Sequence, residues 1–144
     1  MTSVDTNILV YAHNVAAPEH PKALAFLTAH LEGRDFALSK LILLEFYNLL
    51  RNPAVFPRPL SATDAVETIQ NLRNNPYWTI LKATTDVSDA IWTVAADPSI
   101  GRRAIFDARI AYSLAAEGVK RFATRNVTDF DRFATFVSFD PLKI

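Results

Sequence analysis

Short apolar runs alternate along this chain with stretches whose apolar residues recur every three or four positions. Short apolar runs bounded by polar or turn-forming residues are typical of buried strands. The runs that predict strands are residues 2–4, 36–38, 79–81, 119–124 and 136–137. The pattern therefore predicts five short strands spread over the whole length of the chain.

The stretches between these runs predict helices because their apolar positions fall on one helical face. The predicted helices cover residues 21–33, 40–50, 62–74, 86–96 and 104–117. Ser39 and Ser61 are residue types that cap helix N-termini, and Gly118 suits a left-handed C-terminal cap. Asp5 directly follows the first strand and is of the type that would cap a further helix from Thr6.

Short strands that alternate with helices predict an α/β fold with a parallel sheet covered on both faces. Residues 1–144 contain no repeat, low-complexity tract or linker, so we expect a single domain. In such a sheet, ligands bind beyond the carboxyl ends of the strands, where the strand order reverses. Polar residues that directly follow apolar strands are therefore the first candidates for a functional site.

The amino-acid composition excludes several kinds of functional site. The 144 residues include no cysteine, which excludes disulfides, thiolate metal ligands and cysteine nucleophiles, and we expect a cytoplasmic protein. The start MTSVDTNILVY lacks the basic and apolar segments of a secretory signal, and no apolar run is long enough to span a membrane. The net charge is zero, yet residues 101–144 hold eight Lys and Arg against five Asp and Glu.

Four carboxylates lie unusually close to apolar segments. They are Asp5, Glu45, Asp107 and Asp129. Each has an ordinary interpretation, respectively a helix cap, a surface residue, a favourable charge near a helix N-terminus, and a turn residue. Strand-end and helical acids of a parallel sheet can also meet at one edge, where a cluster of this kind would need a cation. Oxygen ligands without thiols suit Mg²⁺ or Mn²⁺, and the three histidines have no zinc-motif spacing.

At these acids the sequence resembles the PIN-domain endoribonucleases, and among them the VapC-type toxins of toxin–antitoxin modules. Successive acids are separated by 40, 62 and 22 residues. The matching segments are Val4-Asp5-Thr6-Asn7-Ile8-Leu9, Glu45 within LILLEFYNLLRNP, Phe106-Asp107-Ala108-Arg109-Ile110-Ala111 and Thr124-Arg125-Asn126-Val127-Thr128-Asp129-Phe130.

The resemblance implies a three-layer α/β/α fold and metal-dependent hydrolysis of RNA phosphodiesters by an acidic quartet of Asp5, Glu45, Asp107 and Asp129. Asp5 and Asp107 would hold Mg²⁺, with Mn²⁺ as an alternative. Asp131 competes with Asp129 for the last place, which the N-x-x-D-F pattern gives to Asp129. The groups that would orient these acids or the substrate are Thr6, Asn7, Thr124 and Asn126.

The same resemblance suggests how RNA would be held. Its phosphates would meet basic side chains, for which the candidates are Arg102, Arg103, Arg109 and Arg125. Tyr47 and Trp78 are aromatic residues that could stack on unpaired bases, although aromatic residues of this kind more often pack in the core. The implied partners are an RNA substrate and a small cognate antitoxin that covers the cleft, with toxin homodimers and toxin–antitoxin hetero-oligomers as the implied assemblies.

Three alternatives of another class are to be weighed on the sequence. A receiver-like phosphorylation domain also places acids at strand ends, but it would want paired acids after the first strand, where this chain has only Asp5. A haloacid-dehalogenase-type phosphatase would want Asp-x-Asp, and Asn7 stands in the second position. A non-catalytic nucleic-acid-binding module would keep the basic residues without the chemistry.

Overall fold

The centre of the molecule is a five-stranded parallel sheet with the strand order β3-β2-β1-β4-β5. The computed structural model describes residues 1–143. Its strands are β1 (Thr2–Val4), β2 (Phe36–Ser39), β3 (Thr79–Leu81), β4 (Arg121–Ala123) and β5 (Val137–Phe139). The first strand lies in the middle, so the chain builds one half of the sheet, then returns to β1 and builds the other half.

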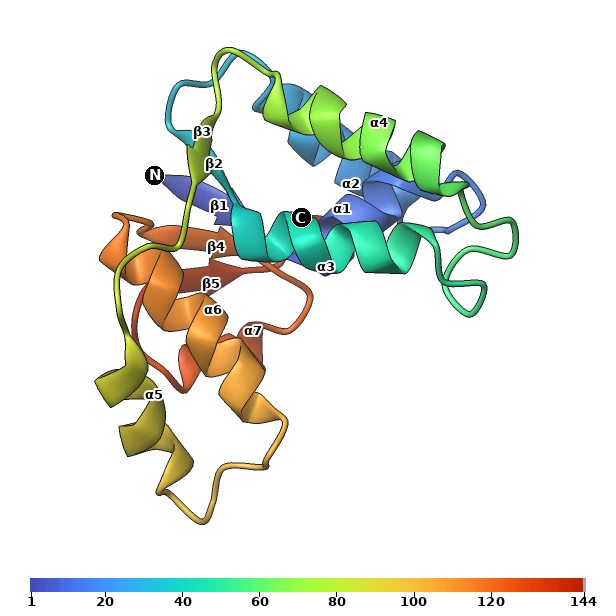
Figure 1. The fold of residues 1–144 in the computed structure, drawn as a ribbon. Coiled ribbons are helices and arrows are strands. Elements are labelled where there is room, and N and C mark those ends of the chain that lie inside the picture. Colours follow the sequence, from blue (N-terminus) through green and yellow to red (C-terminus); the bar gives the residue numbers. More distant parts are fainter. Residues whose placement is uncertain (144) are drawn as a thin grey trace.

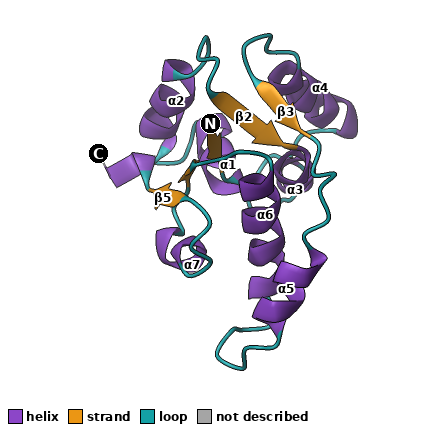
Figure 2. Cartoon of the chain, turned by 90° about the vertical axis from the view of Figure 1, so that its left-hand side faces the viewer, coloured by secondary structure: helices purple, strands orange, loops and turns teal. Residues whose placement is uncertain are grey.

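Helices cover both faces of this sheet (Figure 1). They are α1 (Thr6–His13), α2 (His20–Ala29), α3 (Lys40–Leu50), α4 (Ala62–Arg73), α5 (Ser88–Ala95), α6 (Ala104–Ala116) and α7 (Val127–Asp131), followed by the 3₁₀ helix Pro141–Lys143. Figure 1 shows α1 to α4 in the upper part of the view and α5 to α7 in the lower part. Turned by 90°, Figure 2 shows the strands between the two groups of helices.

Two apolar cores correspond to these two faces, because successive side chains of a strand point to opposite sides. Phe36 and Leu38 of β2 pack in the core that contains α1 to α4. Ala37, between them, packs in the second core with residues of α6 and α7. The three-layer α/β/α architecture expected from the sequence is therefore confirmed.

Local signals account for several element boundaries. Ser39 Oγ accepts a hydrogen bond from the Leu41 N–H at 3.1 Å, and Ser61 Oγ accepts one from the Asp64 N–H at 3.1 Å. Gly118 has a φ of 95° after α6, a backbone conformation that side chains disfavour. These caps explain why α3, α4 and α6 begin or end where the sequence indicated.

Some predicted boundaries were wrong. The helix predicted to end near Gly33 ends at Ala29, after which the N–H groups of His30 and Leu31 donate to carbonyls three residues earlier and the backbone continues as turns. Of the three periodic leucines that predicted it, Leu27 alone is buried. The last strand starts one residue later than predicted, and the strand predicted over residues 119–124 is confined to Arg121–Ala123. Helix α7 was not predicted. Within residues 1–143, no helix is long and apolar enough to cross a bilayer.

The sheet reverses its strand order at β1 and β4. The last backbone pair between these strands is Val4 with Ala123. The Asp5 N–H continues the pairing and donates to the Ala123 carbonyl at 2.8 Å. Asp5 and Thr124, each one residue past its strand, therefore emerge side by side at the carboxyl edge of the sheet, which is the place where open parallel sheets bind ligands.

Candidate active site

Asp5 is held at the carboxyl end of β1 by two hydrogen bonds to its carboxylate. The Thr6 N–H donates to Oδ1 at 2.8 Å, so Asp5 caps α1 as its residue type suggested. The Thr124 hydroxyl donates to Oδ2 at 2.6 Å. Asp5 is 7% exposed. The Asp5 side chain therefore caps α1 and lines the candidate site at the same time.

The loop after β4 is tied to the start of α1 by a short network. The Asn126 N–H donates to Thr124 Oγ1 at 3.0 Å. The Arg125 N–H donates to Asn7 Oδ1 at 3.4 Å. The structure thus brings together all four residues predicted to orient the site, namely Thr6, Asn7, Thr124 and Asn126. Among the described residues, Thr6 Oγ1 is a buried polar atom without a hydrogen-bond partner beside Asp5.

Three of the four predicted acids line one pocket of about 440 Å³. Asp5 contributes from the end of β1, Glu45 from α3, and Asp107 from the first turn of α6. Asn7, Tyr11 and Asn126 share its wall. Sites for small ligands typically occupy roughly 300–1,000 Å³, so this pocket has room for part of a nucleotide chain.

The electrostatics of the pocket follow from burial and from like charge. The pKa of Asp5 is raised from 3.8 to about 6. Burial is the largest cause and repulsion from Glu45 and Asp107 adds to it, while the hydrogen bonds from Thr124 and Thr6 act in the opposite direction. Burial also raises the pKa of Asp107, as do Asp129 and Glu45, whereas Arg132 lowers it. Unneutralised carboxylates in one pocket are electrostatically unfavourable, and a cation would relieve this.

Asp129 lies at the margin of this group. It is exposed in the first turn of α7, and its Oδ1 is 3.6 Å from Nη2 of Arg132. The charge of Asp129 raises the pKa of Asp107, whereas Asp131 is not among the causes that shift the pKa of Asp5 or Asp107. This coupling is consistent with Asp129 as the fourth acid, which stays a prediction.

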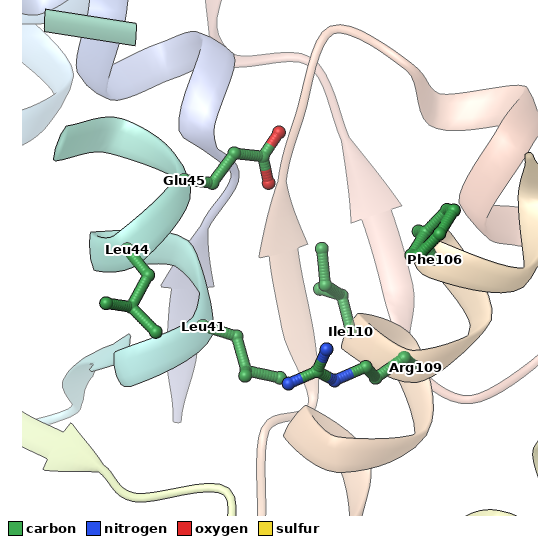
Figure 3. A pocket seen from close by; sticks show the side chains of 6 residues that line it. All are labelled: Leu41, Leu44, Glu45, Phe106, Arg109 and Ile110. Carbon is green, nitrogen blue, oxygen red and sulfur yellow. The ribbon is translucent and has the colours of Figure 1, made fainter. Parts of the chain in front are cut away.

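The four arginines proposed for RNA phosphates lie in different surroundings. Arg109 lines a groove of about 210 Å³ between α3 and α6, which shares Glu45 and Ile110 with the acidic pocket. Figure 3 shows the Arg109 guanidinium reaching across α6 towards Leu41, with Glu45 on the facing helix. Arg102 and Arg103 are exposed in the segment before α6 and do not line the acidic pocket.

Arg125, the fourth arginine, is engaged elsewhere. Its Nε lies 3.0 Å from Oδ2 of Asp140, just after β5. Asp140 directly follows β5, but the strand predicted from the sequence ended at residue 137, so this acid was not recognised as a strand-end residue. Arg132 was likewise missed as a neighbour of the acids, although it stands three residues after Asp129.

Of the two interpretations of Trp78, the structure supports core packing and not base stacking. Trp78 is buried in the core around α2 and β2, and its indole N–H donates to the His30 carbonyl at 2.7 Å. Tyr47 is half-buried, and its hydroxyl accepts a hydrogen bond from Arg51 at 3.3 Å. Neither side chain lines the acidic pocket.

The donors in the pocket fit a hard divalent cation by their chemistry. They are carboxylates, with amide and hydroxyl oxygens beside them. No group of three or more Asp, Glu or His side chains within residues 1–143 is close enough to coordinate one ion. Mg²⁺ is commonly held by one or two carboxylates, with water and substrate phosphate completing its shell, so two protein carboxylates suffice. Asp5 and Asp107 remain the pair that the buried part of the pocket offers.

Comparisons with known proteins agree with this geometry. The PIN domain family model matches residues 3–135. Ribonuclease VapC24 of Mycobacterium tuberculosis is 45% identical over 142 residues, which cover 99% of this chain and 97% of that protein.

Solved structures match the fold over nearly the full chain. The crystal structure of Mycobacterium tuberculosis VapC20, a Sarcin-Ricin loop cleaving toxin, superposes with a TM-score of 0.70 at 18% identity and covers 95% of this chain and 97% of that one. The structure of VapBC2 from Rickettsia felis bound to a DNA fragment from their promoter superposes with a TM-score of 0.66 at 17% identity and covers 96% of this chain and 97% of that one.

Proposed function

Because the chain belongs to the PIN-domain family, we propose that it is a VapC-type ribonuclease toxin that hydrolyses RNA phosphodiester bonds with the help of a divalent cation. The observation that carries this proposal is the pocket in which Asp5, Glu45 and Asp107 meet at the strand-order reversal. The relation to ribonuclease VapC24, at 45% identity over nearly the whole chain, supports the same activity.

Asp5 and Asp107 would hold Mg²⁺ or Mn²⁺. When bound, the cation would supply Lewis acidity, by lowering the pKa of water and balancing charge on the phosphate. The residues of the chain would orient the cation ligands and the substrate. Thr124 and the Thr6 N–H fix both oxygens of Asp5, which prevents its carboxylate from rotating away from the pocket. Fixed orientation is a large part of what a site contributes to phosphoryl chemistry.

Glu45 faces the same pocket from α3, across from α6. We assign to it the acceptance of the proton that the attacking water loses. Attack by water, and not by the ribose 2′-hydroxyl, would leave a 5′-phosphate and a 3′-hydroxyl on the products. Asp129, which is paired with Arg132 and raises the pKa of Asp107, would add negative charge to the α7 side of the site and so favour a cation there.

Arg109 is the basic residue best placed for a flanking phosphate, because the groove that it lines (Figure 3) shares Glu45 and Ile110 with the acidic pocket. The groove also contains exposed apolar side chains. Leu44 is 62% exposed and Phe106 is 66% exposed. We assign this apolar rim to a small antitoxin that covers the cleft, a partner supported by the match to the VapBC2 structure. RNA and antitoxin would then compete for the same groove.

A non-catalytic nucleic-acid-binding module is the remaining alternative, and cleavage separates it from the enzyme. Purified chain is incubated with total RNA in Mg²⁺ or in EDTA, beside an Asp107→Asn variant, and the new RNA ends are sequenced. We expect discrete 5′-phosphate ends with wild type in Mg²⁺, which are lost in EDTA and in the variant. RNA that is bound but uncut by folded wild-type protein in Mg²⁺ and in Mn²⁺ would refute the enzymatic proposal. The family match over residues 3–135 argues against a receiver-like domain.

A further inference from the structure

Asp140 and Arg125 form an ion pair at the ends of the last two strands of the sheet. Arg125 Nε lies 3.0 Å from Asp140 Oδ2, and the side chains are 32% and 6% exposed, respectively. The Leu142 N–H donates to the other oxygen of Asp140 at 2.9 Å. A carboxylate this deeply buried requires such partners, and it therefore holds the Arg125 side chain in one place.

Arg125 stands in the chain between two residues of the candidate site. Before it, the Thr124 hydroxyl donates to Asp5 Oδ2 at 2.6 Å, and after it, the Asn126 N–H donates to Thr124 Oγ1 at 3.0 Å. Its own N–H donates to Asn7 Oδ1 at 3.4 Å. The side chain that anchors Arg125 therefore anchors the segment that orients Asp5.

The Arg125 guanidinium also contacts α1. It lies 6.0 Å from the ring centroid of Tyr11, a residue that lines the acidic pocket. An arginine over an aromatic ring is attracted to it electrostatically. Arg125 thus connects the end of β5 to the helix that Asp5 caps, and two separate parts of the pocket wall depend on one side chain.

We propose that Asp140 is a positioning residue for the acidic site, which acts by holding Arg125 and, through the Thr124 segment, the Asp5 carboxylate. Asp140 does not line the acidic pocket, so it has no direct route to substrate or cation. This inference rests on the proposed function, because the orientation of Asp5 affects a rate only in an enzyme. On this proposal Arg125 holds the Thr124 segment in position, and it does not make the phosphate contact that the sequence suggested.

Asp140→Asn is the informative variant. It preserves the shape of the side chain and an acceptor for the Leu142 N–H, but it removes the charge that pairs with Arg125. Because the Arg125 side chain is 32% exposed, water can solvate the released guanidinium, so we expect the variant to fold. Asp140→Glu keeps the charge on a longer side chain and serves as the conservative variant. Asp35→Asn is the matched control, since Asp35 is an exposed residue before β2 that pairs with the N-terminal amine at 3.4 Å.

Cleavage kinetics on a short single-stranded RNA in Mg²⁺ provide the first test. Residues that orient a catalytic ligand typically affect activity by roughly 10–100-fold. We expect Asp140→Asn to lower kcat within this range with KM changed less than about twofold, Asp140→Glu to recover part of the loss, and Asp35→Asn to match wild type. The double variant Arg125→Met/Asp140→Asn should be no slower than the slower of its single variants, because the two residues act as one unit. A wild-type kcat in Asp140→Asn, or losses that multiply in the double variant, would overturn the proposal.

Amide hydrogen exchange provides a test that needs no cleavage. We expect the N–H groups of Arg125 and Asn126 to exchange faster in Asp140→Asn. The Thr124 N–H donates to the Phe139 carbonyl at 2.9 Å and should keep its protection. If wild type fails to cut RNA, the proposed function fails and exchange alone decides the positioning role. Unchanged protection at both amides in Asp140→Asn would refute that role whatever the kinetics.

Discussion

The Thr124 hydroxyl donates a 2.6 Å hydrogen bond to the carboxylate of Asp5, a residue 119 positions earlier in the chain. The contact exists because β1 and β4 are neighbours in the sheet. Asp5 directly follows the last residue of β1, and Thr124 directly follows the last residue of β4. Asp5 is therefore both buried and oriented, and these two properties lead to measurable consequences for stability, cation binding and activity.

The stability of the cation-free protein should increase when Asp5 becomes neutral. The folded-state pKa of Asp5 is raised from 3.8 to about 6, so the folded state binds this proton more tightly than the unfolded state. The associated stability is fully present below pH 4 and is lost as the pH rises through about 6. At pH 8 the ionised carboxylate is thus destabilising. We expect Asp5→Asn to raise the free energy of unfolding by roughly 1–3 kcal/mol in EDTA, allowing for altered hydrogen bonds to Thr124.

Urea unfolding of wild type and Asp5→Asn at pH 4 and pH 8 checks this expectation, with Asp35→Asn as the control for an exposed carboxylate. The gain should shrink or vanish at pH 4, where Asp5 is largely protonated in the folded state. A variant that is less stable than wild type at both pH values would show that the hydrogen bonds of the carboxylate outweigh its burial.

A divalent cation should stabilise the wild-type protein, and more so at pH 8 than at pH 5. Binding to the folded state alone adds stability, and protons compete for Asp5 and Asp107, whose pKa values are both raised. If cation binding adds about 1 kcal/mol to the free energy of unfolding, Tm should rise by roughly 4 °C in a chain of this size. Thermal melts in Mg²⁺, Mn²⁺ or K⁺ at equal ionic strength measure the effect. An equal shift in Asp5→Asn and Asp107→Asn would place the cation elsewhere.

Activity should distinguish the two acids of α7. Asp107→Asn removes a proposed cation ligand and should lower kcat by roughly 100-fold or more. Asp129→Asn should lower kcat by roughly 10-fold, because Asp129 acts on Asp107 at a distance. Asp131→Asn is the matched control on the same helix and should behave as wild type. Single-turnover cleavage assays compare the three variants, and a larger loss in Asp131→Asn than in Asp129→Asn would reverse the assignment.

Arg109 should contribute to RNA binding through a phosphate. Arg109→Ala is expected to raise KM while leaving kcat within about twofold of wild type, and to reduce the salt dependence of RNA binding by about one phosphate contact. Arg102→Ala is the comparison, since Arg102 is exposed away from the acidic pocket. Measurements of Kd by fluorescence anisotropy at several salt concentrations, with uncleavable RNA, give the slopes. Equal slopes for wild type and Arg109→Ala would remove Arg109 from the RNA path.

Much of the fold was accessible from local sequence signals. The strand Thr79–Leu81 and the helix after Ser39 have the bounds that apolar runs and cap residues predicted. Helix α7 was missed because its five residues are too few to show a helical period, and Asp129 within it was given the ordinary interpretation of a turn residue. The strand order was also inaccessible, since alternation of strands and helices predicts a parallel sheet without saying which strands are neighbours.

The same limit explains what was missed at the site. Asp5 and Asp107 could be proposed together, because motifs and strand ends indicate one edge of the sheet. The ion pair between Asp140 and Arg125 could not be proposed from the sequence. It depends on the pairing of β5 with β4 and on the direction in which the Arg125 side chain points. Sequence patterns identified the charged residues at strand ends more readily than they identified which residue pairs with which.

The division of the pocket between the two ends of the chain affects its biosynthesis. Asp5 is translated well before β4, the strand beside it, and before Thr124, the residue that orients its carboxylate. A nascent chain therefore cannot assemble the complete pocket until the segment that contains β4 and Thr124 has been made.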